Sequence, residues 1–144
     1  MKANQYVREV ETIFKTSVEE KVKVNSSKDA YDLFCDIQNS TQEKLIALHL
    51  ATDNSVTCFQ VVHIGTMKEA PCNPADIFRT ALLTGAVSLI VMHNHPGGST
   101  HPSKTDLEIF HKIKEAARLF GIKIFDLIII GKNSYYSATD SRKL

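Results

Sequence analysis

The chain has 144 residues, of which 43% are hydrophobic, so its length and composition correspond to one ordinary globular domain. Its 17 basic and 16 acidic residues form no basic stripe, so charge gives no support for a nucleic-acid-binding surface. The first residues lack the apolar core of a signal peptide, no apolar run is long enough to span a membrane, and the three cysteines form no C-x-x-C pair. We therefore expect a cytoplasmic protein with reduced thiols and no membrane contact.

The first half of the sequence predicts two helices and a hairpin. Apolar residues at helical spacing predict a helix over residues 4–16, and Ser27 is the expected N-cap of a second helix. Residues 1–40 are therefore expected to form a helical lead-in. Two apolar strands, 43–51 and 56–65, are separated by turn residues and predict a hairpin, and their nearly continuous hydrophobicity predicts burial on both faces.

The second half alternates helices and strands. A helix is expected after Asn73, which is a good N-cap, and a short apolar strand is expected over residues 87–92. Ser103 is the expected cap of a long amphipathic helix, which strands at 122–130 and 135–138 follow. This alternation predicts an α/β fold, with a single domain whose mixed central sheet is flanked by helices.

Three residues around a Pro-Gly-Gly turn predict a metal site. His93 and His95 stand two apart at the end of a strand, where extended backbone directs both imidazoles to the same side. Asp106 follows in the first turn of a helix, and the intervening loop is long enough to bring its carboxylate back to the histidines. Two imidazoles and a carboxylate form a catalytic zinc set that leaves the fourth tetrahedral position for water. Zinc lowers the pKa of such a water to about 7.

Other interpretations of the same residues remain open at this point. Ser103-x-x-Asp106 also matches a capping box, although a cap would fix the direction of the carboxylate and so agree with a metal site. The H-N-H-P stretch alone is also compatible with a polar loop. His101 is either a solvated loop residue or one that faces a substrate, whereas His49 and His63 are interpreted as structural histidines on strands.

The spacing of these groups resembles that of a known family of enzymes. H-x-H, seven residues, S, two residues, D is the signature of the JAMM (MPN-plus) metalloproteases, and it is matched at every position by His93, His95, Ser103 and Asp106. The fuller string HNHPGGSTHPSKTD is similar to the RadC branch of that superfamily. Because the resemblance begins near Gln42 and runs to the end of the chain, we interpret residues 41–144 as a RadC-like JAMM catalytic domain.

The resemblance implies a JAMM and cytidine-deaminase-like architecture, a zinc cofactor and hydrolysis. In this family a glutamate on an early strand is the general base, and Glu43 in QEKLIALHL occupies that place, with Glu69 in a later loop as the competing candidate. Ser103 would donate a hydrogen bond to the oxyanion. Two departures stand out: the family's D-H pair is Asp126-Leu127 here, and no helix-hairpin-helix signal precedes the core.

The expected function is zinc-dependent hydrolysis of an amide or isopeptide bond, with a peptide or isopeptide as partner. The main alternative is a non-enzymatic module associated with DNA repair or mobile elements, in which the metal site is structural or vestigial. A metal-dependent nuclease is a third interpretation, which the one-metal ligand set disfavours. Nucleic acid therefore remains an open alternative as a partner, because the family is traditionally labelled as DNA repair, although the charge distribution does not support it. A homodimer formed through residues 1–40 also remains open.

Overall fold

A computed structural model describes residues 8, 10–16, 19–66 and 72–142. One five-stranded sheet has the order β2-β1-β3-β4-β5. Its strands are β1 Lys44–Leu50, β2 Val56–Ile64, β3 Ser88–Asn94, β4 Lys123–Gly131 and β5 Ser134–Ser137. β3 and β4 run parallel, while the other neighbouring strands are antiparallel. The predicted α/β class with a mixed central sheet is confirmed.

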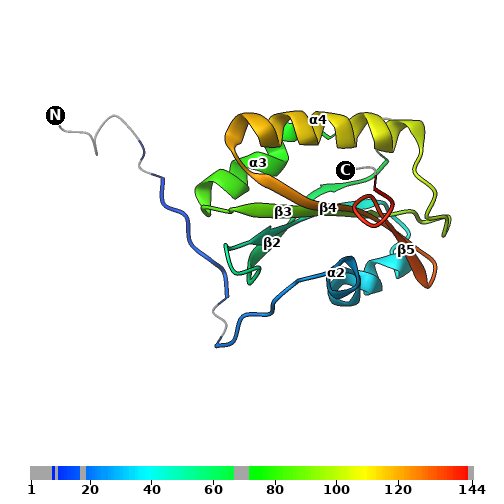
Figure 1. The fold of residues 1–144 in the computed structure, drawn as a ribbon, viewed down its shortest axis with the longest axis horizontal. Coiled ribbons are helices and arrows are strands. Elements are labelled where there is room, and N and C mark those ends of the chain that lie inside the picture. The colour runs from blue at the N-terminus through cyan, green and yellow to red at the C-terminus, as the bar shows by residue number, and fades with distance from the viewer. Residues whose placement is uncertain (1–7, 9, 17–18, 67–71, 143–144) are drawn as a thin grey trace.

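Helices cover both faces of the sheet (Figure 1). α3 (Pro74–Leu83) and α4 (Lys104–Phe120) pack on one face, and α2 (Ser27–Phe34), followed by the 3-10 helix η1 (Cys35–Asn39), packs on the other. Alternate residues of the central strands therefore enter two cores: Leu45 and Ala47 of β1 face α3 and α4, while Ile46 and Leu48 face α2. Within the described residues, no helix has the length and hydropathy needed to cross a membrane.

The predicted burial of the hairpin is correct for only one of its strands. Residues 45–50 of β1 are all buried, because β1 lies between β2 and β3 with helices above and below. β2 is an edge strand, and it leaves Phe59 and Val61 exposed to 57% and 42%. Their apolar side chains lie on the α2 face, which α2 covers incompletely, so hydrophobicity along β2 does not report burial on both faces.

The predicted helix over residues 4–16 is wrong for the part that the structure describes. Arg8 and residues 10–16 belong to no helix, and Val10 and Ile13 are 79% and 76% exposed. The segment extends away from the sheet (Figure 1). A short amphipathic helix is marginal in water unless its apolar face packs on another element, and here that surface is missing. Residues 4–7 and 9 lie outside the described residues.

The cap of α2 lies one residue earlier than the sequence suggested. Ser26 rather than Ser27 is the N-cap, and its hydroxyl accepts a hydrogen bond from the Asp29 amide while the Asp29 carboxylate accepts from the Ser26 amide. Ser27 instead donates its hydroxyl proton to Asp140 near the C-terminus, over 2.5 Å. The predicted caps of α3 at Asn73 and of α4 at Ser103 are confirmed.

A buried carboxylate fastens the residues that follow β5 to the sheet. Asp126 of β4 is 1% exposed, and it accepts hydrogen bonds from the Leu127 amide (2.7 Å), the Thr139 amide (3.0 Å) and the Ser137 hydroxyl (2.6 Å). Three donors to one carboxylate compensate for its removal from water. Asp126 therefore has a structural role, and the departure from the family at Leu127 leaves that role intact.

His49 is a buried base at the opposite end of β1 from residues 43–45. It is fully buried, and its Nδ1 lies 2.9 Å from the Thr84 hydroxyl, which donates its own proton to the Thr80 carbonyl. Nε2 is buried without a hydrogen-bond partner among the described residues. Burial lowers the pKa of His49 from 6.5 to about 4.

This burial predicts a loss of stability in mild acid. Between pH 6.5 and about 4 the unfolded chain binds a proton at His49 that the folded chain does not, so the free energy of unfolding falls as pH falls through this window. The slope from this residue approaches about 1.4 kcal/mol per pH unit. Urea unfolding at several pH values should show that His49→Gln lacks this part of the slope. Parallel curves for the two proteins would contradict the prediction.

Candidate metal centre

Four residues that the sequence singled out lie together at one end of the sheet. His93 is the last residue but one of β3, His95 follows the strand, Asp106 lies in the first turn of α4, and Glu43 directly precedes β1. One side-chain ligand atom from each can be chosen so that all four lie within 4.8 Å of one another. Glu69, the competing candidate for the base, lies outside the described residues.

Strand register brings Glu43 to the histidines. β1 and β3 are antiparallel, and Leu45 pairs with His93, so the start of β1 meets the end of β3. The Glu43 carboxylate reaches the buried His93 ring, with 2.9 Å between Oε1 and Nδ1. The two residues are far apart in the chain, and only this pairing makes them neighbours.

The N-cap of α4 orients Asp106. The Ser103 hydroxyl accepts a hydrogen bond from the Asp106 amide over 3.1 Å, and Asp106 Oδ2 accepts from the Ser103 amide over 2.7 Å. These reciprocal bonds form a capping box, so the capping interpretation of the sequence is confirmed. The box fixes the carboxylate and turns Oδ1 toward His93 Nε2, 3.3 Å away, so capping and ligand geometry come from the same two residues.

The loop between His95 and Ser103 is held against the end of β4. The His95 amide donates to the Ile130 carbonyl (3.0 Å), and the Lys132 amide donates to the Gly98 carbonyl (2.9 Å). A Cβ atom at Gly131 would lie only 2.5 Å from the Gly98 carbonyl oxygen, so this close approach requires glycine. The strand end, the loop and the helix start therefore form one rigid support for the metal candidates.

The hydrogen bonds of the two imidazoles define which nitrogens face inward. His93 Nδ1 bonds to the Glu43 carboxylate, and His95 Nδ1 bonds to the Ser99 carbonyl, each over 2.9 Å. Both partners can only accept, so both Nδ1 atoms carry the proton. In the neutral imidazoles both Nε2 atoms therefore face Asp106 without a proton, at 3.3 Å from Oδ1 for His93 and 3.1 Å from Oδ2 for His95, so that a metal ion or a second ring proton is needed to pair them with the carboxylate.

This arrangement has the chemistry of a divalent-metal site. His93 Nε2 is buried and has no hydrogen-bond partner among the described residues, although a carboxylate oxygen lies beside it. Two electron-rich atoms can face each other away from water only when a metal ion or a second ring proton carries positive charge between them. Ligands 2.0–2.1 Å from a tetrahedral ion are separated by about 3.3 Å, close to the observed 3.1 and 3.3 Å. The residues present thus fit a small divalent ion.

The electrostatics of the cluster favour positive charge as well. Burial acts to raise the pKa of Asp106, but the hydrogen bond from His95, the electrostatic influence of the adjacent His93 ring and the Ser103 hydrogen bonds outweigh it and lower that pKa to about 2. The hydrogen bond to Asp106 raises the pKa of His95, against the opposing effect of burial. Without a metal, a proton at His95 supplies part of the missing charge. Metal and proton therefore compete for the site.

Sequence reasoning missed Asn94, the residue between the two histidines. Its side chain is fully buried and bonds to the main chain on both sides of Glu43. The only signal in the sequence was its place in H-N-H, which carries no information about a partner some 50 residues away. His101 is an exposed loop residue, and among the described residues no hydrogen bond or ion pair joins it to the four clustered side chains. Ser103 is exposed, and its hydroxyl oxygen serves the cap.

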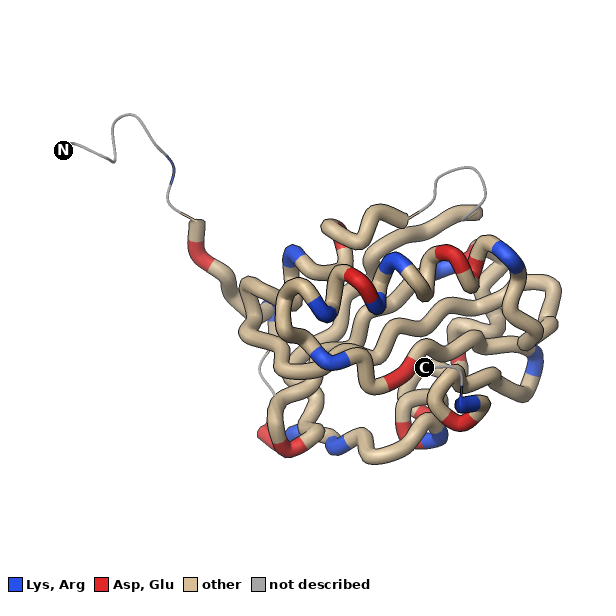
Figure 2. The backbone as a smooth tube through the Cα atoms, turned by 45° about the horizontal axis from the view of Figure 1, so that its top comes forward, with Lys and Arg blue, Asp and Glu red and all other residues tan. Residues whose placement is uncertain are grey.

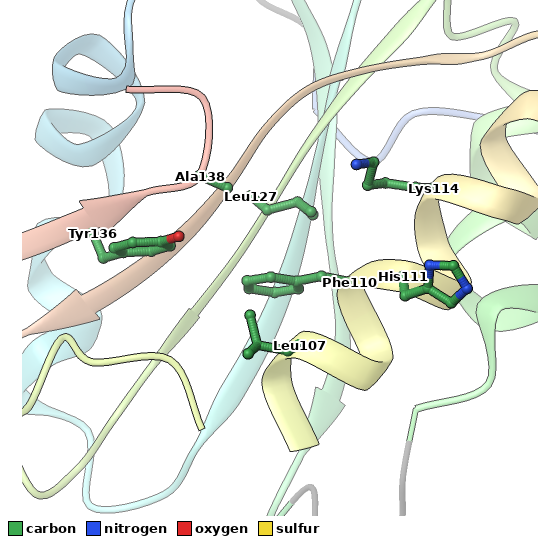
Figure 3. A pocket seen from close by; sticks show the side chains of 7 residues that line it. All are labelled: Leu107, Phe110, His111, Lys114, Leu127, Tyr136 and Ala138. Carbon is green, nitrogen blue, oxygen red and sulfur yellow. The ribbon is translucent and has the colours of Figure 1, made fainter. Parts of the chain in front are cut away.

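A cavity of about 180 Å³ lies beside the site, between α4 and the last two strands (Figure 3). Phe110 connects the two places: its ring lines the cavity and also contacts the His93 ring edge-on, with 6.1 Å between centroids. None of the four clustered residues lines the cavity. Its volume is below the roughly 300–1,000 Å³ of small-molecule sites. The cavity is therefore too small for a substrate pocket, and Phe110 in its wall packs against one side of the centre.

Comparison with known proteins agrees with the motif. A family model described as a RadC-like JAB domain matches residues 24–144. The chain is 39% identical over 127 residues to a UPF0758 protein of Methanosarcina mazei, covering 87% of this chain and 56% of the relative. It is 38% identical over 125 residues to a UPF0758 protein of Carboxydothermus hydrogenoformans, covering 86% and 55%. A UPF0758 protein of Streptococcus gordonii is 36% identical over 121 residues, covering 84% and 54%.

The chain thus spans little more than half the length of these relatives, and the matched part contains the whole sheet, all the described helices and the four clustered residues. The family model begins at Val24, before α2, so α2 and η1 fall within the match. On the evidence of this match, the chain belongs to the family of RadC-like JAB domains.

Proposed function

We propose that this domain is a zinc-dependent hydrolase that cleaves an amide or isopeptide bond. The observation that carries the proposal is the buried Nε2 of His93, which faces Asp106 Oδ1 at 3.3 Å and has no hydrogen-bond partner among the described residues. A structural zinc site is closed by four protein ligands, whereas a catalytic site keeps an open position. Here three ligand side chains converge, and the fourth group of the cluster, Glu43, is already bonded to the ring of His93.

Each residue has a distinct task in this reaction. His93, His95 and Asp106 would hold the metal, which when bound lowers the pKa of a water to about 7 and so supplies a nucleophile at neutral pH. Glu43 takes a proton from the attacking water at Oε2, because Oε1 accepts from His93. As the new C–O bond forms and the C–N bond breaks, Glu43 returns that proton to the leaving nitrogen. Ser103 donates its hydroxyl proton to the developing oxyanion, since its oxygen can accept from the Asp106 amide at the same time.

No observation favours nucleic acid as the partner instead. Acidic and basic residues are interspersed along the backbone of α4, and basic residues do not gather in one part of the chain in the view of Figure 2. Pairs such as Arg79 and Asp76 of α3 neutralise one another locally, 3.2 Å apart. Phosphate binding depends on a concentration of positive charge. A peptide or isopeptide therefore remains the proposed partner.

The first prediction concerns metal content. The purified chain should bind close to one zinc ion, and Asp106→Asn should lower zinc affinity more than 100-fold, because loss of an outer partner alone typically costs 10–100-fold. Asparagine can still accept from the Ser103 amide, so the helix cap is retained. Elemental analysis and zinc titration give the measurement, with His111→Ala on the exposed face of the same helix as the control. Equal zinc affinity in Asp106→Asn and wild type would contradict the ligand assignment.

The second prediction separates the base from the ligands. Glu43→Gln should keep zinc, because the amide oxygen can still accept from His93 Nδ1, but it should reduce hydrolysis about 10²–10⁴-fold, because an amide cannot take up the proton of water. Turnover is measured on a library of fluorogenic peptides and lysine isopeptides. Glu115→Gln, an exposed change on α4, is the matched control. Undiminished turnover in Glu43→Gln would reject the assignment.

The third prediction tests Ser103 apart from its cap. Glycine is nearly as good an N-cap as serine, and the replacement costs only a few tenths of a kcal/mol. Ser103→Gly should therefore leave the melting temperature almost unchanged while turnover falls about 10²–10³-fold, since an oxyanion donor is lost. Ser26→Gly, the same change at the N-cap of α2 on the other face of the sheet, is the control, because that serine also belongs to a capping box but lies apart from the four clustered residues. If both variants hydrolyse the library as wild type does, Ser103 is a cap alone.

A further inference from the structure

The side chain of Asn94 replaces main-chain pairing at the end of the sheet. Asn94 is the last residue of β3, and because neighbouring residues of a strand alternate, it points to the face opposite His93. It is fully buried there. Its Oδ1 accepts from the Lys44 amide over 2.7 Å, and its Nδ2 donates to the Gln42 carbonyl over 3.1 Å. The last residue pair between β1 and β3 is Leu45 with His93, so this side chain continues the pairing where the strands stop.

The two groups that Asn94 holds lie on either side of Glu43. The Glu43 carbonyl itself accepts from the Gly65 amide over 2.8 Å, at the end of β2. The main chain of residues 42–44 is therefore fixed from both neighbouring strands, by Gly65 on one side and Asn94 on the other. Thr41 and Gln42 are exposed, so little packing would otherwise hold this segment.

Only a short amide can do this. Lys44 offers a donor and Gln42 an acceptor, so the side chain must accept with one atom and donate with another. Aspartate has the same length but cannot donate to the Gln42 carbonyl. Alanine leaves both main-chain groups without this partner in a partly buried place, where unmade hydrogen bonds carry a cost.

We propose that Asn94 is a positioning residue that places Glu43 in the centre by holding the main chain of Gln42 and Lys44. The inference rests on the proposed function in so far as Glu43 is the base. Asn94 touches no reacting atom, and it acts through the backbone that carries the carboxylate. Displacement of a reacting group by 1 Å can reduce a rate about 100-fold, so rigid placement of residues 42–44 matters to the chemistry.

The first test needs no substrate. Native-state hydrogen exchange of the 144-residue chain loaded with zinc is measured at the Lys44 amide, with the Ala47 amide in the middle of β1 as internal reference. Asn94→Ala should accelerate exchange at Lys44 at least roughly fivefold relative to Ala47. Ile90→Ala, buried on the same face of β3, is the matched control, because it should not act selectively on Lys44. Unchanged relative exchange at Lys44 in Asn94→Ala would overturn the proposal.

The second test is a double-mutant cycle on a fluorogenic isopeptide. Asn94→Asp should keep zinc affinity, because the ligands are untouched, and lower kcat about 100-fold with little change in KM. Combined with Glu43→Gln it should have almost no further effect, since the misplaced group is already inactive. Ile90→Ala should have the same effect in both backgrounds. An equal loss from Asn94→Asp with and without Glu43→Gln would mean general destabilisation and reject positioning.

The two proposals fail in different ways. If Glu43→Gln by itself retains full turnover, the base assignment is wrong, whereas selective exchange at Lys44 in Asn94→Ala would still show that Asn94 holds residues 42–44. If Glu43→Gln is inactive but neither Lys44 exchange nor the cycle responds to Asn94, the hydrolase stands and the positioning role is lost.

Discussion

The central constraint on the site is the close approach of two buried electron-rich atoms, His93 Nε2 and Asp106 Oδ1, which lie 3.3 Å apart. Neither can donate to the other when the His93 proton lies on Nδ1, where Glu43 accepts it. Burial removes the water that would otherwise separate them, so the pair is stable only with a cation nearby. In the metal-free chain, the lowered pKa of Asp106 and the raised pKa of His95 both follow from the proximity of these groups, which favours positive charge on the ring and negative charge on the carboxylate.

Ordinary structural devices assemble the cluster. A capping box that stabilises the start of α4 also sets the direction of the Asp106 carboxylate, and the position of that carboxylate near the positive end of the helix favours its ionised form. A glycine at 131 lets the loop after His95 lie flat on the end of β4. These features would stabilise the domain with no metal at all. The fold itself therefore orients the ligand side chains before a metal binds.

Two buried histidines on β-strands show how context separates structure from chemistry. His49 faces the hydroxyl of Thr84, and burial keeps it neutral in the apolar core. His93 is as deeply buried, yet carboxylates lie at both of its ring nitrogens. Residue type and burial are the same in the two places. The difference comes from the charged partners that neighbouring elements bring to the ring.

The structural features that depend on residues close together in the chain could be predicted from the sequence. His93 and His95 share a side because they are two apart in extended backbone, Ser103 and Asp106 form a capping box because they are three apart at a helix start, and the caps at Asn73 and Ser103 follow from local hydrogen bonding. The mixed α/β sheet followed from the order of apolar segments. Spacing alone did not separate the capping role of Ser103 and Asp106 from a metal site, because the same spacing serves both.

The features that depend on partners distant in the chain could be recognised only from the tertiary structure. Strand register placed Glu43 on His93 and gave Asn94 the main chain of residues 42 and 44 to hold. The edge position of β2 exposed apolar residues that continuous hydrophobicity had assigned to a core, and the lack of a packing surface left residues 10–16 without a helix. A sequence pattern reports which side chains can share a face. It does not report what lies opposite that face, and that neighbour decides burial, tautomer and charge.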